Sequence, residues 1–355
     1  MKALVLTGGS GSRLRPFSYS MPKQLFPVAG RPVLEHVLVN IAAIRVTEVA
    51  VVAGDWLGVV KDAIGDGSRF GLRITYIHQD RPRGLAHGVM VAQDFLGDDD
   101  FVMYLGDNIL PGGIAGVARE FRMDHAAARV VVQKVPDPRQ FGVVEKNPDG
   151  TVARLVEKPA RPVSDLALLG VYFFRAQIHE AVAAVTPSAR GELEITDAIQ
   201  WLLARGAQVA VSDYAGYWRD VGCVEDVLCC NRRLLDRLRP AVVGRVDTAS
   251  TLEGAVALGF GAEVVRSRIR GPVVVGAGSV VADCDIGPDV SVGARCVLHG
   301  AQICDSIVLD GARISGMPGL HGSVIGRFAT IARQGVSQGR HQLIVGDYTR
   351  IETAA

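Results

Sequence analysis

Two different patterns of apolar residues divide the chain. Residues 2–240 alternate short β-branched runs with longer segments whose apolar residues recur at helical spacing. This alternation is typical of a mainly parallel sheet covered by helices, an α/β fold. Helices are expected between the strands, for example over residues 84–95 and over 194–205, which ends at Gly206 in the position of a C-cap. The predicted strands are residues 3–7, 48–53, 73–78, 101–105, 129–135, 168–174 and 208–211.

A repeat replaces this pattern from about Val256. Apolar residues recur every five or six positions, and several precede glycine, as in Val275-Gly276. A parallel β-helix requires such a period, because each short strand points one apolar side chain inward before the chain turns a corner. An antiparallel domain would instead alternate with period two. We therefore expect an α/β domain over residues 1–240 and a parallel β-helix over residues 241–355. The repeat positions are Val275, Val281, Ile286, Val292, Leu298, Ile303, Leu309 and Ile314.

Composition removes several classes of function. The chain has 38 Lys and Arg against 37 Asp and Glu, so it lacks the basic field that binds nucleic-acid backbones. No stretch reaches the roughly 18 uncharged apolar residues of a membrane span, and the first apolar run is too short for a secretory signal. We expect a cytoplasmic protein without a membrane partner. The six cysteines lie after residue 220 without a Cys-x-x-Cys motif, so we expect reduced, mostly buried thiols.

A glycine-rich turn follows the first predicted strand. Residues 8–16 read GGSGSRLRP. In an α/β sheet such a turn lets backbone N–H groups converge on phosphate, and arginines add positive charge. The spacing matches neither a Walker A loop nor the dinucleotide fingerprint, so an ordinary turn stays open. Shortly afterwards Lys23 stands between Pro22 and Pro27, in stiffer surroundings than a solvated lysine requires.

These two motifs together resemble the sugar-phosphate nucleotidyltransferase superfamily, whose signature is Gly-Gly-x-Gly-x-Arg-Leu followed by Pro-Lys-x-Leu. Further ordered matches place the resemblance in the glucose-1-phosphate thymidylyltransferase branch and extend it over residues 3 to about 235. The C-terminal repeat resembles the left-handed β-helix of the long form. The other matching stretches are residues 65–68, 79, 84–86, 105–108, 141–145, 157–159, 170–172, 190–197 and 218–222.

The resemblance implies an Mg²⁺-dependent enzyme and a homo-oligomer. Such an enzyme transfers a nucleotidyl group from dTTP to glucose 1-phosphate and forms dTDP-glucose and pyrophosphate. Catalysis of this kind is mostly positioning and charge neutralisation. Asp107 follows the strand 101–105, where an open α/β sheet presents its ligands, and a carboxylate suits Mg²⁺. Asp220 supplies a second carboxylate by resemblance. The alternatives are a helix N-cap for Asp107 and a surface ion pair for Asp220.

The nucleotide-binding residues follow from the same resemblance. Arg13 and Lys23 hold the triphosphate and stabilise the leaving pyrophosphate. Gln79 reads the pyrimidine edge, and Gly84 lets the base approach the backbone. Ser12 stands where many members have threonine, which keeps a hydroxyl near the phosphates. The full nucleotide set is Leu6, Gly8, Gly9, Gly11, Ser12, Arg13, Gln79, Gly84 and Asp107.

The sugar-phosphate residues form a second expected set. Lys158 neutralises the sugar phosphate and Glu157 accepts hydrogen bonds from sugar hydroxyls, unless the two form a solvated ion pair. Glu192 either contacts sugar or merely begins a helix. Phe141 replaces the tyrosine of shorter relatives and so removes one possible hydrogen bond to the sugar. The full set is Phe141, Gly142, Glu157, Lys158, Gly170, Glu192 and Trp218.

Other readings of the chain stay open at this point. A phosphate nucleophile is already ionised and needs no general base, so His36, His87 and His125 are expected on helix surfaces or in the core. The segment 223–239, with Arg232, Arg233 and Arg237, is expected to form a solvated basic helix face. Alternative functions are a transferase that uses UTP or another nucleotide, and a non-catalytic subunit. A third is a bifunctional enzyme whose β-helix transfers acyl groups, with the candidate bases His299, His321 and His341.

Overall fold

A computed structural model describes residues 1–9, 11–148, 150–333 and 340–353, so Ser10 of the glycine turn lies outside the described residues. The chain forms two compact units. The first contains Met1–Gly9 and Leu34–Asp220, and the second contains Ser10–Val33 and Val221–Ala355. This division by packing differs from the expected domain boundary at residue 240. That boundary stays a prediction. Within the described ranges, no helix is long and apolar enough to cross a membrane.

A nine-stranded mixed sheet forms the centre of the first unit. Strands β6, β1, β4 and β5 are parallel, and β11 pairs antiparallel with β6, β8 and β9. All seven predicted strands are present within two residues of their expected ends, whereas β9 and β10 were not predicted as strands. The strands are β1 (Lys2–Leu6), β4 (Glu48–Ala53), β5 (Arg73–His78), β6 (Phe101–Leu105), β8 (Ala128–Lys134), β9 (Gly142–Lys146), β10 (Val152–Glu157), β11 (Leu166–Phe174) and β12 (Val209–Asp213).

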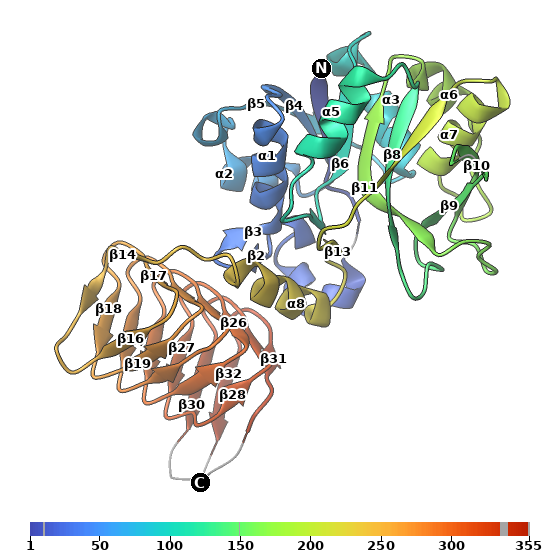
Figure 1. The fold of residues 1–355 in the computed structure, drawn as a ribbon. Helices are drawn as coiled ribbons and strands as arrows, with labels where there is room; N and C mark the ends of the chain where they lie inside the picture. Colours follow the sequence, from blue (N-terminus) through green and yellow to red (C-terminus); the bar gives the residue numbers. More distant parts are fainter. Residues whose placement is uncertain (10, 149, 334–339, 354–355) are drawn as a thin grey trace. The chain divides into compact units, whose positions relative to one another are not determined.

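Helices cover this sheet (Figure 1). On one face α3, α6 and α7 pack on a continuous apolar core that contains Leu4, Met103 and Ile199. On the other face the α1 residue Asn40 donates a hydrogen bond to the buried Tyr104 hydroxyl at 3.1 Å. The fold class predicted from the sequence is therefore confirmed. The helices are α1 (Val33–Ala43), α2 (Leu57–Ile64), α3 (Leu85–Val91), α4 (Gln93–Leu96), α5 (Ala115–Met123), α6 (Ile178–Ala184) and α7 (Ile195–Ala204), with a 3-10 turn at Ser68–Phe70.

Two of these helices test the predicted ends. Helix α7 ends one residue before Arg205, and Gly206 then adopts φ 80° as expected of a glycine beyond a C-cap. The predicted helix 84–95 is instead interrupted at Ala92 and forms α3 and α4. A small two-stranded sheet of β7 (Asn108–Ile109) and β13 (Arg219–Asp220) completes the unit.

The second unit is built on a parallel β-helix with three faces, consistent with the expected left-handed form. Equivalent residues recur after about one coil of 17 positions, so that Ile269 pairs with Ile286 and Val281 with Leu298. These side chains fill the axis. The three sheets are β14 (Ala241–Val242), β17 (Val256–Leu258), β20 (Val273–Val275), β23 (Val290–Val292), β26 (Ser306–Val308), β29 (Val324–Ile325), β31 (Ile344–Val345); β15 (Arg245–Val246), β18 (Glu263–Val265), β21 (Val280–Ala282), β24 (Val297–His299), β27 (Arg313–Ser315), β30 (Thr330–Arg333), β32 (Arg350–Thr353); and β16 (Thr251–Glu253), β19 (Arg268–Arg270), β22 (Asp285–Ile286), β25 (Gln302–Cys304), β28 (Leu320–His321).

Buried hydroxyl and thiol groups link successive coils. The Cys284 amide donates to Ser267 Oγ at 3.0 Å, and the Cys296 amide donates to Ser279 Oγ at 2.9 Å. One coil later, the Ala301 amide donates to Cys284 Sγ, so serine and cysteine occupy equivalent positions. All six cysteines are free. These small side chains satisfy backbone amides inside the coil, where an unpaired donor would be costly.

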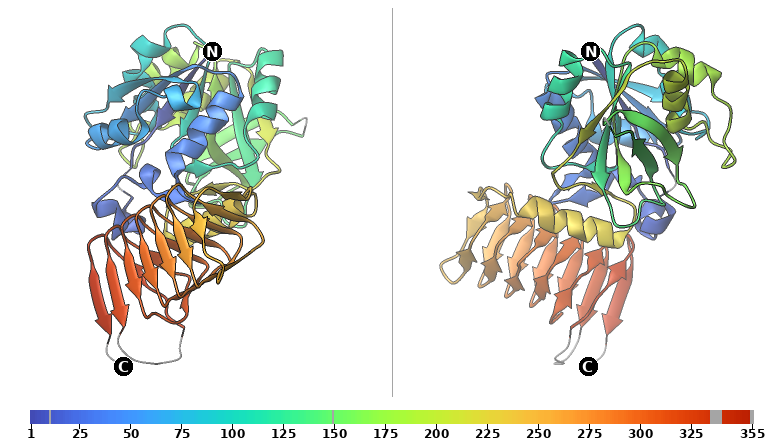
Figure 2. Two further views of the ribbon diagram at one scale, coloured as in Figure 1. Left: turned by 90° about the vertical axis from the view of Figure 1, so that its left-hand side faces the viewer. Right: turned by 45° about the vertical axis from the view of Figure 1, so that its right-hand side comes forward.

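Helix α8 (Val224–Leu235) and an N-terminal segment complete the second unit. The right-hand view of Figure 2 shows α8 along the β-helix, where it packs on β23 and β26. The expected solvated basic face is wrong for Arg232, whose guanidinium lies 2.6 Å from Asp305 of the β-helix. The N-terminal segment contains 3-10 turns at Ser12–Leu14, Phe17–Tyr19 and Lys23–Leu25, followed by the hairpin β2 (Pro27–Val28) and β3 (Arg31–Pro32).

Candidate active site

Asp107 and Asp220 are brought together at the end of β6. Strand pairing sets Asp220 opposite Asn108, the residue after Asp107. The Asn108 amide donates to Asp107 Oδ1 at 2.8 Å, and its own oxygen accepts from Trp218 Nε1 at 2.6 Å. Asp107 is 9% exposed and Asn108 only 2%. Asn108 therefore fixes the orientation of one predicted metal ligand and one predicted sugar residue, a role that the sequence did not reveal.

Two predicted glycines leave space for these polar side chains. A Cβ on Gly170 would lie 2.8 Å from Asn108 Nδ2. A Cβ on Gly142 would lie 3.0 Å from the Glu157 carboxylate, which faces it across the β9–β10 pair. Both glycines act as spacers for a neighbour rather than as flexible hinges.

The expected sugar residues lie in one connected group. The rings of Phe141 and Trp218 meet edge to face with centroids 5.1 Å apart. The Phe141 carbonyl accepts a hydrogen bond from the Lys158 amide at 3.0 Å. Lys158 has φ 40°, a left-handed conformation that is uncommon for a non-glycine residue. Trp218 joins this group to Asp107 through Asn108.

Arg190 connects three carboxylates beside Lys158. Its guanidinium lies 3.5 Å from Glu157 and 3.1 Å from both Glu192 and Glu194. The alternative that Glu192 begins a helix is not supported, because α7 starts at Ile195 after Glu194. The sequence revealed no role for Arg190, because only the fold brings the distant Glu157 to the nearby Glu192 and Glu194.

The electrostatics of Glu157 reflect this crowding. Burial raises the pKa of Glu157 and the neighbouring Glu194 carboxylate raises it further, whereas Lys158 and Arg190 lower it. Lys158 Nζ lies 3.9 Å from Glu157 and keeps more than a third of its side-chain surface exposed. The solvated pair considered from sequence is therefore wrong for Glu157, which is mostly buried, and Lys158 remains accessible to an anion.

Gln79 forms the centre of the expected base-reading position. It is 8% exposed, and its Nε2 lies 2.9 Å from Nδ1 of the buried His87. Burial, with the nearby Arg83, lowers the pKa of His87, so the neutral ring accepts a hydrogen bond from the amide. The Gln79 oxygen lies 3.9 Å from where a Cβ on Gly8 would stand. His87 is thus a core residue as predicted, with an added role in orienting Gln79.

Gly84 and Leu6 have structural reasons for their identity. A Cβ on Gly84, which has φ 106°, would lie 2.4 Å from the Leu193 carbonyl oxygen. Leu6 is buried at the end of β1, where its side chain packs against Gly88. Close packing of the protein backbone therefore already requires glycine at position 84.

The residues of the glycine turn that were expected to bind phosphate divide between the two units. Gly9 has φ 104° and Gly11 φ 58°, so the turn needs both glycines. In the second unit, Gly11 precedes the 3-10 turn that contains Ser12 and Arg13.

Two further glycine contacts place Arg13 and Lys23. A Cβ on Gly11 would lie 3.6 Å from Lys23 Cβ. A Cβ on Gly222 would lie 2.8 Å from Arg13 Nη2. Gly222 therefore leaves the space that the Arg13 guanidinium occupies, a role that the sequence did not reveal.

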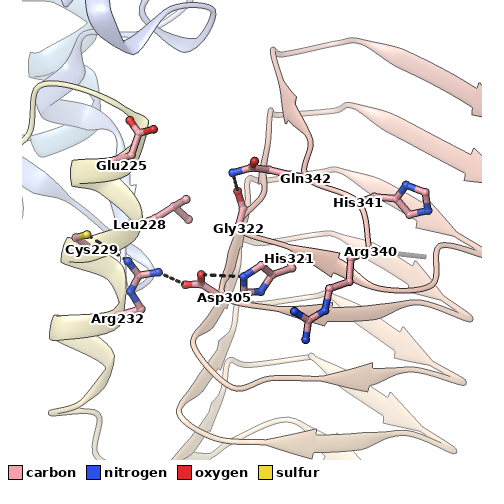
Figure 3. A pocket seen from close by; sticks show the side chains of 10 residues that line it. All are labelled: Glu225, Leu228, Cys229, Arg232, Asp305, His321, Gly322, Arg340, His341 and Gln342. Atoms are coloured by element: carbon pink, nitrogen blue, oxygen red, sulfur yellow. Dashed lines mark hydrogen bonds and ion pairs between the residues drawn. The ribbon is translucent and has the colours of Figure 1, made fainter. Parts of the chain in front are cut away.

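The histidines of the β-helix were candidate acyl-transfer bases. His321 Nε2 lies 3.9 Å from Asp305 Oδ2. Both residues line a cavity of about 450 Å³, and Arg232 of α8 lies on its other wall (Figure 3). His321 Nδ1 also lies 3.3 Å from Cys304 Sγ, and burial raises the pKa of this thiol. His341 contacts Arg333, and His299 contacts Asp283. Each of the three histidines thus has a polar or charged neighbour on the β-helix, and the acyl-transfer alternative stays a prediction.

The chain belongs to the nucleotidyl transferase family, whose model matches residues 2–237. It is 48% identical over 355 residues to a glucose-1-phosphate thymidylyltransferase of Streptomyces griseus, and the match covers all of both chains. It is 49% identical to the enzyme of the same name from Streptomyces antibioticus, over 99% of each chain. A solved Bacillus anthracis structure, described as a candidate glucose-1-phosphate thymidylyltransferase with sucrose, matches with TM-score 0.63 and 33% identity over 68% of this chain and 97% of its own.

Proposed function

We propose that the protein is a glucose-1-phosphate thymidylyltransferase that converts dTTP and glucose 1-phosphate to dTDP-glucose and pyrophosphate. The observation that carries this proposal is the connected group of Asp107, Asn108, Trp218 and Lys158, which places carboxylate, aromatic and cationic side chains within one unit. The full-length similarity to two enzymes of that name supports it.

Asp107 and Asp220 fit a magnesium ion by the chemistry of their donors. Mg²⁺ prefers oxygen ligands and is usually held by one or two carboxylates together with substrate phosphates and water. Among the described residues, no three His, Cys, Asp or Glu side chains gather into a site made by protein alone. When bound, the ion would neutralise charge on the triphosphate.

The chain's own residues bind and orient the two anions. The already ionised sugar phosphate oxygen attacks the α-phosphorus of the nucleotide, and pyrophosphate leaves. Lys158 offers an exposed ammonium to the sugar phosphate, while the mostly buried Glu157 accepts hydrogen bonds from sugar hydroxyls. Arg13 and Lys23 supply positive charge to the triphosphate. No side chain needs to remove a proton, which agrees with the absence of a histidine from these roles.

Pyrimidine selection follows from Gln79. Its amide can pair with N3–H and O4 of thymine, but uracil presents the same edge. A single methyl group contributes roughly 10- to 200-fold in selectivity, so UTP should be used less efficiently than dTTP but measurably. Purine triphosphates should stay near background, since a two-ring base cannot pair with Gln79 in the same way.

Pyrophosphate release over a matrix of nucleoside triphosphates and sugar 1-phosphates tests the proposal. The expected order is dTTP, then UTP, then ATP and GTP, with glucose 1-phosphate as acceptor. Purine triphosphates outperforming dTTP would contradict it. The cytoplasmic location and homo-oligomeric assembly stay predictions.

A further inference from the structure

The N-terminal segment that carries Arg13 and Lys23 is attached to the last coils of the β-helix. Ser20 Oγ donates a hydrogen bond to Asp347 Oδ2 at 2.7 Å, although 327 positions separate them. Arg327 completes the contact, because its Nη2 donates to the Ser20 carbonyl at 3.1 Å and lies 2.7 Å from the Asp347 carboxylate. The Asp347 side chain is only 4% exposed.

Shape complementarity accompanies these bonds. A Cβ on Gly346 would lie 3.1 Å from Pro16 Cβ, so the coil and the segment are in close contact. Asp347 also accepts the Arg327 amide at 2.6 Å and the Arg327 Nε at 2.8 Å. The carboxylate thus has a buried position with several charge-assisted partners, which are the stronger kind of hydrogen bond.

A second anchor holds the far end of the same segment. Asn231 of α8 is 1% exposed and accepts the Ala29 amide at 2.9 Å. The same oxygen accepts Ser291 Oγ at 2.6 Å, and Asn231 Nδ2 donates to the Asp289 carbonyl at 3.2 Å. The segment is therefore tied to the β-helix at Ser20 directly and at Ala29 through α8.

The segment between the anchors is packed on itself. Phe17 and Phe26 are fully buried, and their rings meet edge to face with centroids 5.4 Å apart. Lys23 lies between these rings in sequence, three positions after Ser20, and its Cβ lies near Gly11. Ser20, Lys23 and the turn that carries Arg13 therefore belong to one packed segment.

We infer that Ser20, Arg327 and Asp347 are positioning residues for nucleotidyl transfer: the end of the β-helix holds the segment of Arg13 and Lys23 in place for the triphosphate. The inference rests on the proposed function, because it takes Arg13 and Lys23 as nucleotide-binding residues. It gives the β-helix a part in catalysis beyond structure or assembly.

Ser20→Ala and Asp347→Asn in the full chain test this inference. Each should lower kcat/KM for dTTP at least about 10-fold, the loss expected for a hydrogen bond to a charged group, while KM for glucose 1-phosphate changes little. Hydrogen exchange of residues 11–30 should become faster in both variants. Ser20→Thr, which keeps the hydroxyl, should retain most of the activity.

Asp283→Asn is the matched control. The Asp283 carboxylate pairs through two bonds with Arg266 and lies 3.3 Å from His299, both elsewhere on the β-helix. It should leave both kcat/KM and exchange of residues 11–30 unchanged. Melting temperatures show whether a variant has unfolded. If Asp347→Asn unfolds, the comparison of Ser20→Thr with Ser20→Ala tests the inference.

The outcomes separate the two proposals. A wild-type chain that releases no pyrophosphate contradicts the proposed function, and exchange still reports whether Ser20 and Asp347 hold the segment. Unchanged exchange in folded variants overturns the anchoring. Faster exchange with wild-type kcat/KM for dTTP overturns the role in catalysis.

Discussion

At the scale of single residues, the carboxylates at the end of β6 are the most direct targets. Asp107→Asn and Asp220→Asn should each lower kcat roughly 100-fold or more, because each removes negative charge that would hold the metal. Circular dichroism should stay unchanged, since asparagine has the same shape. Steady-state pyrophosphate release is the measurement, and near-normal rates at saturating Mg²⁺ would contradict the assignment.

Gly222 offers a test of the Arg13 position. In Gly222→Ala the new Cβ would displace the Arg13 guanidinium, which stands 2.8 Å away at the end of a flexible side chain. We expect kcat/KM for dTTP to fall about 10-fold, with little change in melting temperature. Gly116→Ala in α5 is the control, since nothing lies within 4 Å of its Cβ position. Equal kcat/KM values for dTTP in the two variants would show that the space beside Gly222 is not needed to position Arg13.

His87 predicts a pH dependence of nucleotide binding. Its lowered pKa means that the ring is neutral at pH 7 and becomes protonated only below about 6.5. Stability from the neutral ring is present above pH 6.5 and lost as the pH falls, and protonation also removes the acceptor for Gln79. KM for dTTP should therefore rise on acidification. His87→Gln keeps an acceptor without titrating, so its KM should vary less between pH 7.5 and 5.5. An identical acid limb in both proteins would exclude His87 as the cause.

At the scale of elements, the sequence predicted what repeats and missed what depends on a partner. The strands of the α/β sheet and the coils of the β-helix could be predicted because apolar residues recur at a regular spacing along the chain. Val281 and Ile286 are two such residues of the β-helix. By contrast, β9 and β10 are short and carry charged residues. They form strands because β9 pairs with both β10 and β11. The roles of Asn108 and Arg190 were missed because each depends on one distant partner, Trp218 for Asn108 and Glu157 for Arg190.

The buried serines of the β-helix allow a prediction about the element itself. Ser279 is fully buried, donates to the Gly293 carbonyl and accepts the Cys296 amide. Ser279→Ala leaves that amide unpaired and should lower the free energy of unfolding of the second unit by about 1–3 kcal/mol in urea titrations. Ser279→Cys should lose less, since Cys296 occupies the equivalent position one coil later and Cys284 Sγ accepts a backbone amide on another face of the β-helix. Ser315→Ala, at an exposed position, is the control. An equal loss of unfolding free energy there would contradict the stabilising role of the buried serine hydroxyls.

At the scale of the whole molecule, the expected boundary near Arg239 needs a different test. From sequence, the β-helix is a separable module, and a chain that ends at Arg239 should keep nucleotidyl transfer. Such a chain lacks Arg327 and Asp347, so the contacts of Ser20 are lost with it. We now expect the shortened chain to lose at least as much kcat/KM for dTTP as Ser20→Ala. Full activity in a soluble, monodisperse shortened chain would show that the β-helix is a separable module.

The bond between Ser20 and Asp347 also sets an order of events during synthesis. Ser20 leaves the ribosome before its partner, which follows 327 positions later. At about 5–20 residues per second this is a delay of roughly 16–65 seconds. Throughout that time the segment with Arg13 and Lys23 lacks its anchor at the end of the β-helix. Under the proposed function, a chain whose synthesis stops before Asp347 should therefore bind triphosphate poorly.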